Sequence, residues 1–197
     1  MYRLVGTLAL AAGIVLANGG AHATPITYTA TLSGAAETPP NASPGTGTAL
    51  VTLDTAAHTL TVDATFSGLT GTTTAAHIHC CTAAPGTGST GVATQTPTFL
   101  NFPLGVTSGT FSDVFDTTLA ATWNTAFITA NGGTTAGAEA ALAAGLAADE
   151  AYFNIHTTAF TGGEILGFLT AVPEPGTFAL LATGVLGLAL RRRARSA

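Results

Sequence analysis

Residues 48–67 read Thr-Ala-Leu-Val-Thr-Leu-Asp-Thr-Ala-Ala-His-Thr-Leu-Thr-Val-Asp-Ala-Thr-Phe-Ser. Two runs rich in β-forming residues, 48–54 and 59–67, flank a short connection in which His58 is expected to be exposed. Because both runs favour extended backbone and the connection is short, the stretch predicts an antiparallel hairpin. The residues expected to face the core are Leu50, Leu53, Leu60, Val62 and Phe66.

Similar short runs on both sides of this hairpin extend the β pattern along the chain. They are residues 26–32, 72–79, 105–119 (with Phe111, Val114, Phe115 and Leu119 for the core), 151–157 and 164–169. Residues 134–149 are Ala-rich and predict one α-helix over about 135–148, with Thr134 and Thr135 as caps. The expected fold class is all-β, an antiparallel two-sheet β-sandwich with this one inserted helix.

The N-terminus has the pattern of a secretory signal peptide. Arg3 precedes an apolar run over residues 4–16, and Ala21-His22-Ala23 has the small-x-small form that a signal peptidase accepts. We therefore expect a hydrophobic helix in residues 1–23, with cleavage after Ala23. The alternative is a permanent N-terminal anchor, although the run is short for a membrane-spanning helix.

The C-terminus has three parts in a fixed order. Pro173-Glu174-Pro175 is followed by an apolar segment over residues 177–190, expected to form a second hydrophobic helix, and then by a basic cluster. The cluster consists of Arg191, Arg192, Arg193 and Arg195. Cytoplasmic arginines would hold this end inside and leave the preceding domain outside the inner membrane.

Residues 172–197 resemble the PEP-CTERM sorting signal of Gram-negative bacteria. The resemblance implies that an exosortase-type membrane protease acts near the motif, after transient anchoring in the inner membrane. It also implies a destination at the cell surface or outside the cell, often with an exopolysaccharide matrix. An ordinary one-helix anchor is the alternative interpretation of the same segment.

All five basic residues lie in the two ends of the chain, so residues 24–171 contain no Lys or Arg. The same range contains nine of the ten acidic residues, since only Glu174 lies outside it. Without cationic side chains a domain cannot neutralise a phosphate backbone, which argues against nucleic-acid binding. The two cysteines, Cys80 and Cys81, are adjacent, which leaves open a vicinal disulfide or pairing between molecules.

Three histidines in the predicted strands have the pattern of metal ligands. His77 and His79 are two residues apart and so point to the same face of a strand. If His156 lies alongside, three imidazoles suit Zn or Cu, with Glu164 or water as the fourth ligand. The alternative is a buried polar network of these histidines with Asn154 and Glu164 that fixes the register between strands.

Ala76-His77-Ile78-His79, Asn154-Ile155-His156-Thr157 and Gly162-Gly163-Glu164-Ile165 resemble segments of the CHRD (chordin-type) domain. The resemblance extends over about residues 26–170, although Leu166 stands where the bacterial pattern commonly has Arg. No settled activity comes with the family. The expected function is therefore a non-enzymatic surface or matrix module, and the alternative is a secreted Zn or Cu metalloprotein, with enzymatic activity left open. A Ser-His-Asp hydrolase is disfavoured because the chain has no G-x-S-x-G elbow.

Overall fold

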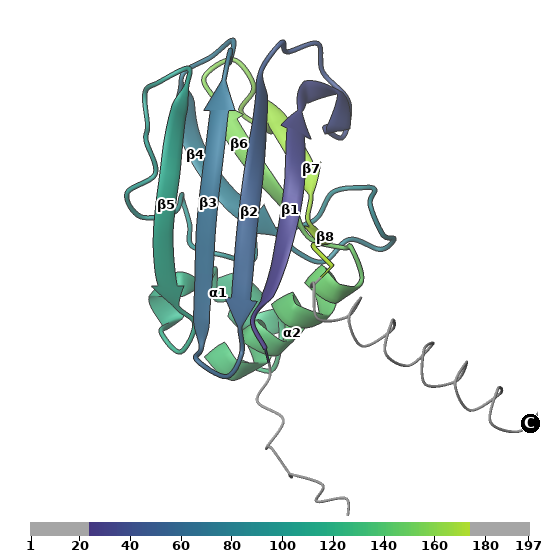
Figure 1. Cartoon of the computed structure of the whole chain (residues 1–197), viewed down its shortest axis with the longest axis vertical. Helices are drawn as coiled ribbons and strands as arrows, with labels where there is room; N and C mark the ends of the chain where they lie inside the picture. Colours follow the sequence, from purple (N-terminus) through teal and green to yellow (C-terminus); the bar gives the residue numbers. More distant parts are fainter. Residues whose placement is uncertain (1–23, 174–197) are drawn as a thin grey trace, which may run out of the picture.

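A computed structural model describes residues 24–173 of the chain (Figure 1). The eight strands are β1 (Ile26–Ser33), β2 (Thr46–Asp54), β3 (Thr59–Ser67), β4 (Thr73–His79), β5 (Gly109–Asp116), β6 (Tyr152–Thr157), β7 (Ile165–Phe168) and β8 (Thr170–Ala171). The helices are η1 (Gly34–Ala36), η2 (Ala120–Thr122), α1 (Thr125–Ala130) and α2 (Thr135–Ala147). The fold is thus mostly β, as the sequence predicts.

The strands form one antiparallel sheet in the order β4-β6-β7-β1-β2-β3-β5, and β8 pairs with β1. The sheet curls into a half-barrel, so that β4 and β6 cross behind β2 and β3 in Figure 1. The two helices α1 and α2 lie together at one end of the barrel (Figure 1). The concave side of the curled sheet encloses the main core.

The predicted two-sheet sandwich is not what the structure shows. The two layers are joined into one sheet because β1 pairs with β2 along its whole length and also with β7 and β8. Ser33 pairs with Leu166 in β7, and Thr29 pairs with Thr170 in β8. These pairs join residues more than 130 positions apart in the chain. Such pairing depends on tertiary contacts, so the local periodicity of the sequence does not predict it.

The structure corrects three of the predicted core residues, two of them by strand alternation, and the third, Leu119, lies beyond the end of β5. Leu50, Val114 and Leu119 are exposed, whereas the other predicted core residues are buried. Leu50 and Leu53 are three residues apart in β2, and a strand places such residues on opposite faces. Ala49, Val51 and Leu53 take the inward positions, and Leu50 faces solvent.

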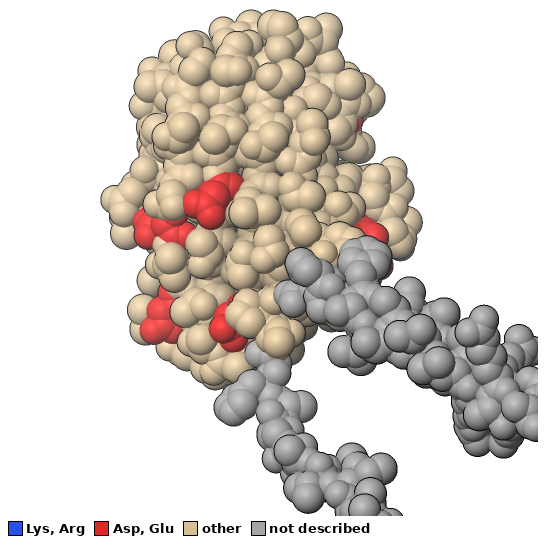
Figure 2. Space-filling model, in the orientation of Figure 1, with Lys and Arg blue, Asp and Glu red and all other residues tan. Residues whose placement is uncertain are grey.

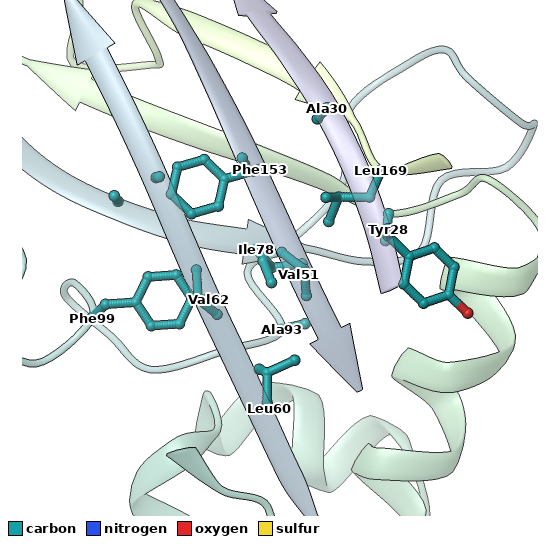
Figure 3. Close-up of a cluster of buried hydrophobic side chains, with 14 of the residues drawn as sticks. Tyr28, Ala30, Val51, Leu60, Val62, Ile78, Ala93, Phe99, Phe153 and Leu169 are labelled. Atoms are coloured by element: carbon teal, nitrogen blue, oxygen red, sulfur yellow. The ribbon is translucent and has the colours of Figure 1, made fainter. Parts of the chain in front are cut away.

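A cluster of buried hydrophobic side chains, aliphatic and aromatic, fills the space between the two halves of the curled sheet (Figure 3). Phe99 belongs to the long loop before β5, yet its side chain is almost fully buried. Its ring centroid lies 5.1 Å from that of Phe115 and 6.1 Å from that of Phe153. The loop over residues 80–98 and its continuation therefore contribute to the core as well as to the surface.

The predicted helix is confirmed as α2, and the side chain of Thr134 caps it by accepting the backbone N–H of Gly137. Sequence analysis did not predict α1, which has six residues and is capped by Asn124. Helices this short are stabilised by packing rather than by intrinsic propensity, so the local sequence carries a weak signal. Phe127 of α1 stacks on Trp123 in the core.

On the visible face, the described residues include scattered acidic side chains and no Lys or Arg (Figure 2). Within residues 24–173, no helix is long and apolar enough to cross a membrane. The two predicted terminal helices, the cleavage site at Ala23 and the arginine cluster lie outside the described residues. The division of the chain into a signal peptide (1–23), a β domain (24–171) and a sorting tail (172–197) stays a prediction.

Cys80 and Cys81 form a vicinal disulfide that packs against α2. At Gly145, in the buried side of this helix, an added Cβ atom would overlap both Sγ atoms. Glycine inside a helix ordinarily costs about 1 kcal/mol relative to alanine. Here the absence of a side chain is what lets the disulfide contact the helix.

We therefore expect Gly145→Ala to lower the free energy of unfolding by up to about 2 kcal/mol, because overpacking costs about 1–3 kcal/mol and the gain in helix propensity offsets about 1 kcal/mol of it. Urea unfolding checks this value. In a Cys80→Ala/Cys81→Ala background the same substitution should be neutral or stabilising. Ala144→Gly, at an exposed position of the same helix, is the control for propensity alone. A stabilised Gly145→Ala single variant would contradict the packing described here.

Candidate functional site

The three histidines lie on the side of the sheet that faces away from the main core. In the pairing of β4 with β6, His77 is opposite Asn154 and His79 is opposite Tyr152. His156 is two residues beyond Asn154 and so points to the same side. The intervening residues, Ala76, Ile78, Phe153 and Ile155, point into the core. Strand alternation thus separates the polar side from the apolar side of the same two strands.

Their imidazoles form one compact cluster. The Nε2 atoms of His77 and His156 are 2.9 Å apart, and one ring nitrogen from each of the three histidines lies within 4.8 Å of the others. The ring centroids of His77 and His79 are 4.7 Å apart. His77 and His79 are buried, and His156 is partly exposed at the edge.

Backbone carbonyls orient two of the three rings. Nδ1 of His79 is 2.8 Å from the carbonyl oxygen of Thr90, and Nδ1 of His156 is 2.9 Å from that of Thr161. A carbonyl only accepts, so we assign the hydrogen to Nδ1 in both rings. Each Nε2 atom then carries a lone pair. This arrangement, with one ring nitrogen donating to a carbonyl, is the usual outer-shell contact of a metal-ligating histidine.

The hydrogen bond between His77 and His156 follows from this assignment. Nε2 of His156 has no hydrogen, so it accepts from Nε2–H of His77. Nδ1 of His77 and Nε2 of His79 remain without a partner although both atoms are buried. A shift of the His77 hydrogen to Nδ1 would leave a lone pair on Nε2 of each of the three rings.

Burial keeps the histidines neutral. Desolvation, together with the neighbouring His79 and His156, lowers the pKa of His77 to about 3. Desolvation likewise lowers the pKa of His79 to about 4, and it lowers the pKa of His156. Within residues 24–173 no Lys or Arg stands near the cluster, because that range contains none. The imidazoles are therefore in the unprotonated form that binds metals at neutral pH.

Tyr152 is a site residue that the sequence analysis missed. Its ring stacks on that of His79, with centroids 4.7 Å apart and an angle of 10° between the planes. Its hydroxyl contacts the backbone of Thr90, the residue whose carbonyl orients His79. The signal was present in the sequence, since Tyr152, Asn154 and His156 alternate along one strand.

The structure does not bring Glu164 into the histidine cluster. Its carboxylate is fully buried and accepts hydrogen bonds from four donors in three separate segments. The donors are Ser43 Oγ (2.5 Å), Thr70 N (2.5 Å), Gly71 N (3.1 Å) and Thr157 Oγ1 (2.6 Å). Both carboxylate oxygens are thereby engaged, so Glu164 serves to tie loops together rather than to complete the cluster.

The hydrogen bonds also decide the charge of Glu164. Burial by itself raises the pKa of this carboxyl, but the donors from Ser43, Thr157, Thr70 and Gly71 together outweigh burial and lower it. The carboxylate is therefore ionised at neutral pH without any cationic partner. The predicted polar network thus divides into two separate parts, the histidine cluster and the Glu164 cluster.

Two family models match the chain. The PEP-CTERM protein-sorting motif matches residues 171–193, of which the structure describes only the first three, ending at Pro173. Such a motif implies processing by an exosortase and indicates export to the surface or exterior of a Gram-negative cell. No curated protein and no solved structure gives a significant match. The model of the CHRD domain matches residues 28–169, which run from within β1 to the residue before β8, and the chain belongs to the CHRD domain family.

Proposed function

We propose that this chain is an exported CHRD domain protein whose domain binds one Zn or Cu ion through His77, His79 and His156. One observation carries the proposal: three neutral imidazoles lie together, with one ring nitrogen from each within 4.8 Å of the others. Two of these rings are held by carbonyls in the orientation that presents Nε2. Neutral imidazole is a ligand that both metals favour.

The spacing of His77 and His156 fits a shared ion after a small outward movement. Ligand nitrogens about 2.0–2.1 Å from a tetrahedral Zn ion are about 3.3 Å from each other. The Nε2 atoms of His77 and His156 are 2.9 Å apart. A shift of a few tenths of an ångström, with loss of the hydrogen between them, would bring these two atoms to that spacing. The ligand nitrogen of His79, within 4.8 Å of both, would move inward to complete the set. Three protein nitrogens leave the fourth position for water or another small ligand.

Export places such a module in contact with the extracellular matrix. We propose that signal peptidase cleaves after Ala23, that residues 177–190 anchor the chain in the inner membrane for a time, and that exosortase then acts near Pro173-Glu174-Pro175. A non-enzymatic binding or structural role in an exopolysaccharide matrix is the second proposal. The absence of Lys and Arg from residues 24–171 supports a neutral rather than polyanionic matrix partner. Recovery of the protein from the cytoplasm alone would contradict export.

Metal titration tests the first proposal. The purified protein, freed of metal with a chelator and dialysed, should bind one equivalent of Zn or Cu per chain when titrated against a chromophoric competitor. Mg²⁺ is the control, because this hard cation prefers oxygen ligands and should not bind at three imidazoles. Failure to bind either transition metal would overturn the proposal.

A further inference from the structure

Four buried side-chain atoms within residues 24–173 have no hydrogen-bond partner. They are Glu37 Oε1, His77 Nδ1, His79 Nε2 and Asn154 Oδ1. Buried polar atoms in folded proteins are nearly always paired, so each exception requires an explanation. Two of the four belong to the histidine cluster, and a third, Asn154, lies directly opposite His77 in the sheet.

Glu37 joins this group through Asn154. It follows η1, and its side chain is buried, with 6% of its surface exposed. The Asn154 amide lies beside the Glu37 carboxyl and acts to lower its pKa. Both groups also lie close to the Cα atom of Gly163. A Cβ atom added there would be 2.6 Å from Oε1 of Glu37 and 2.8 Å from Oδ1 of Asn154. The carboxyl is therefore next to the strand that carries His156.

A cleft connects Glu37 to the outside. It has a volume of about 230 Å³ and is lined by Glu37, Pro39, Phe160 and Gly163, among others. The same loop, residues 158–164, supplies the Thr161 carbonyl that orients His156. The cleft and the histidine cluster therefore share one covering segment.

Three of the four unpartnered atoms are acceptors in a metal-bound centre, because His77 Nδ1 then carries the hydrogen of its ring. The amide oxygen of Asn154 accepts hydrogen bonds, Nε2 of His79 carries a lone pair, and the Glu37 oxygen accepts when the carboxyl is ionised. Burial raises the pKa of Glu37 to about 7, so an ionised carboxylate is accessible at neutral pH. A bound cation can satisfy acceptors of this kind in two ways. The ring nitrogens can bind the cation directly, and the oxygen atoms can accept hydrogen bonds from a water molecule bound to it.

We propose that Glu37 and Asn154 accept the hydrogen atoms of a water molecule bound at the fourth position of a metal ion held by His77, His79 and His156. This inference rests on the metal function proposed above. The metal centre would then have an open coordination position. That position would favour ligands that donate hydrogen bonds, such as water or an alcohol, and would bind small anions weakly. A closed structural metal site has no such position.

Azide is a suitable probe because it is a small anion without hydrogen atoms. In the Cu(II)-loaded protein its binding is followed by the charge-transfer absorption that it forms with the metal. The carboxylate of Glu37 should repel azide, so Glu37→Gln is expected to tighten azide binding about tenfold at about pH 8. At that pH the other titratable groups facing Glu37 do not change, because the histidines are metal-bound and Tyr152, whose pKa is raised by burial, stays protonated.

The matched control is Glu139→Gln. Glu139 is a second buried carboxyl, on α2, whose partners are His58 and Thr117 and not the histidine cluster. It should leave azide affinity unchanged. Glu37→Leu removes the same charge without adding an amide and replaces Glu37→Gln if that variant does not fold.

The outcomes separate the two proposals. Full Cu(II) loading of both proteins with tighter azide binding by the Glu37 variant supports this inference. Full loading with equal azide affinity overturns it and leaves the metal function standing. A protein that takes up no Cu(II) overturns both.

Discussion

Replacement of Glu164 by glutamine is expected to lower the free energy of unfolding by about 3 kcal/mol or more. The carboxylate accepts four hydrogen bonds while fully buried, and hydrogen bonds to a charged group are worth about 1.5–3 kcal/mol each before the cost of unpaired donors. A glutamine would also point its NH₂ group at donors such as the backbone N–H of Gly71. Urea unfolding followed by the fluorescence of Trp123, the only tryptophan, measures the effect.

The pH dependence of this difference identifies its origin. The pKa of Glu164 is lower in the folded protein than its ordinary value, so the unfolded chain binds the proton more readily. The stabilisation is fully present above the ordinary carboxyl pKa and is lost as pH falls through the folded value. The gap between the wild type and Glu164→Gln should therefore narrow below about pH 4.

Asp113→Asn provides the control for Glu164→Gln. The carboxylate of Asp113 makes an exposed hydrogen bond to Asn101, and its loss should change stability by less than about 0.5 kcal/mol. A Glu164→Gln variant as stable as Asp113→Asn would contradict the structural role assigned to Glu164.

Loss of any one of His77, His79 or His156 is expected to abolish the stabilisation that metal gives to the fold. A ligand present at a hundred times its dissociation constant stabilises by about 2.7 kcal/mol. For a domain of this size that corresponds to a rise in Tm of about 5–10 °C. Thermal unfolding with and without Zn or Cu should show this rise in the wild type and none in each alanine variant.

His58→Ala is the matched control for these variants. His58 is the other histidine of the described residues, and it hydrogen-bonds Glu139 away from the cluster. It should keep the full metal-dependent rise in Tm. A rise that survives in His77→Ala, or one that His58→Ala removes, would place the metal elsewhere.

The part of the site that local sequence predicts is the part set by strand alternation. His77 and His79 share a face because they are two residues apart, and this needs no tertiary information. The position of His156 beside them depends on the pairing of β4 with β6, which the sequence analysis stated only as a condition. The structure meets that condition.

The residues that sequence analysis placed wrongly or missed depend on contacts between distant segments. Glu164 follows the histidine strand closely in sequence, yet its partners come from loops around Ser43 and Thr70. Glu37 lies after a 3₁₀ turn with no periodicity, and only its contact with Asn154 connects it to the site. The curled single sheet likewise follows from the pairing of β1 with β7 and β8, which no local pattern encodes.

The most direct test of the metal site is a crystal structure of the Zn- or Cu-loaded protein with anomalous diffraction data at the absorption edge of that metal. We predict one anomalous peak within about 2.0–2.2 Å of a ring nitrogen from each of His77, His79 and His156. A peak bound to other residues, or no peak in crystals grown with excess metal, would contradict the account.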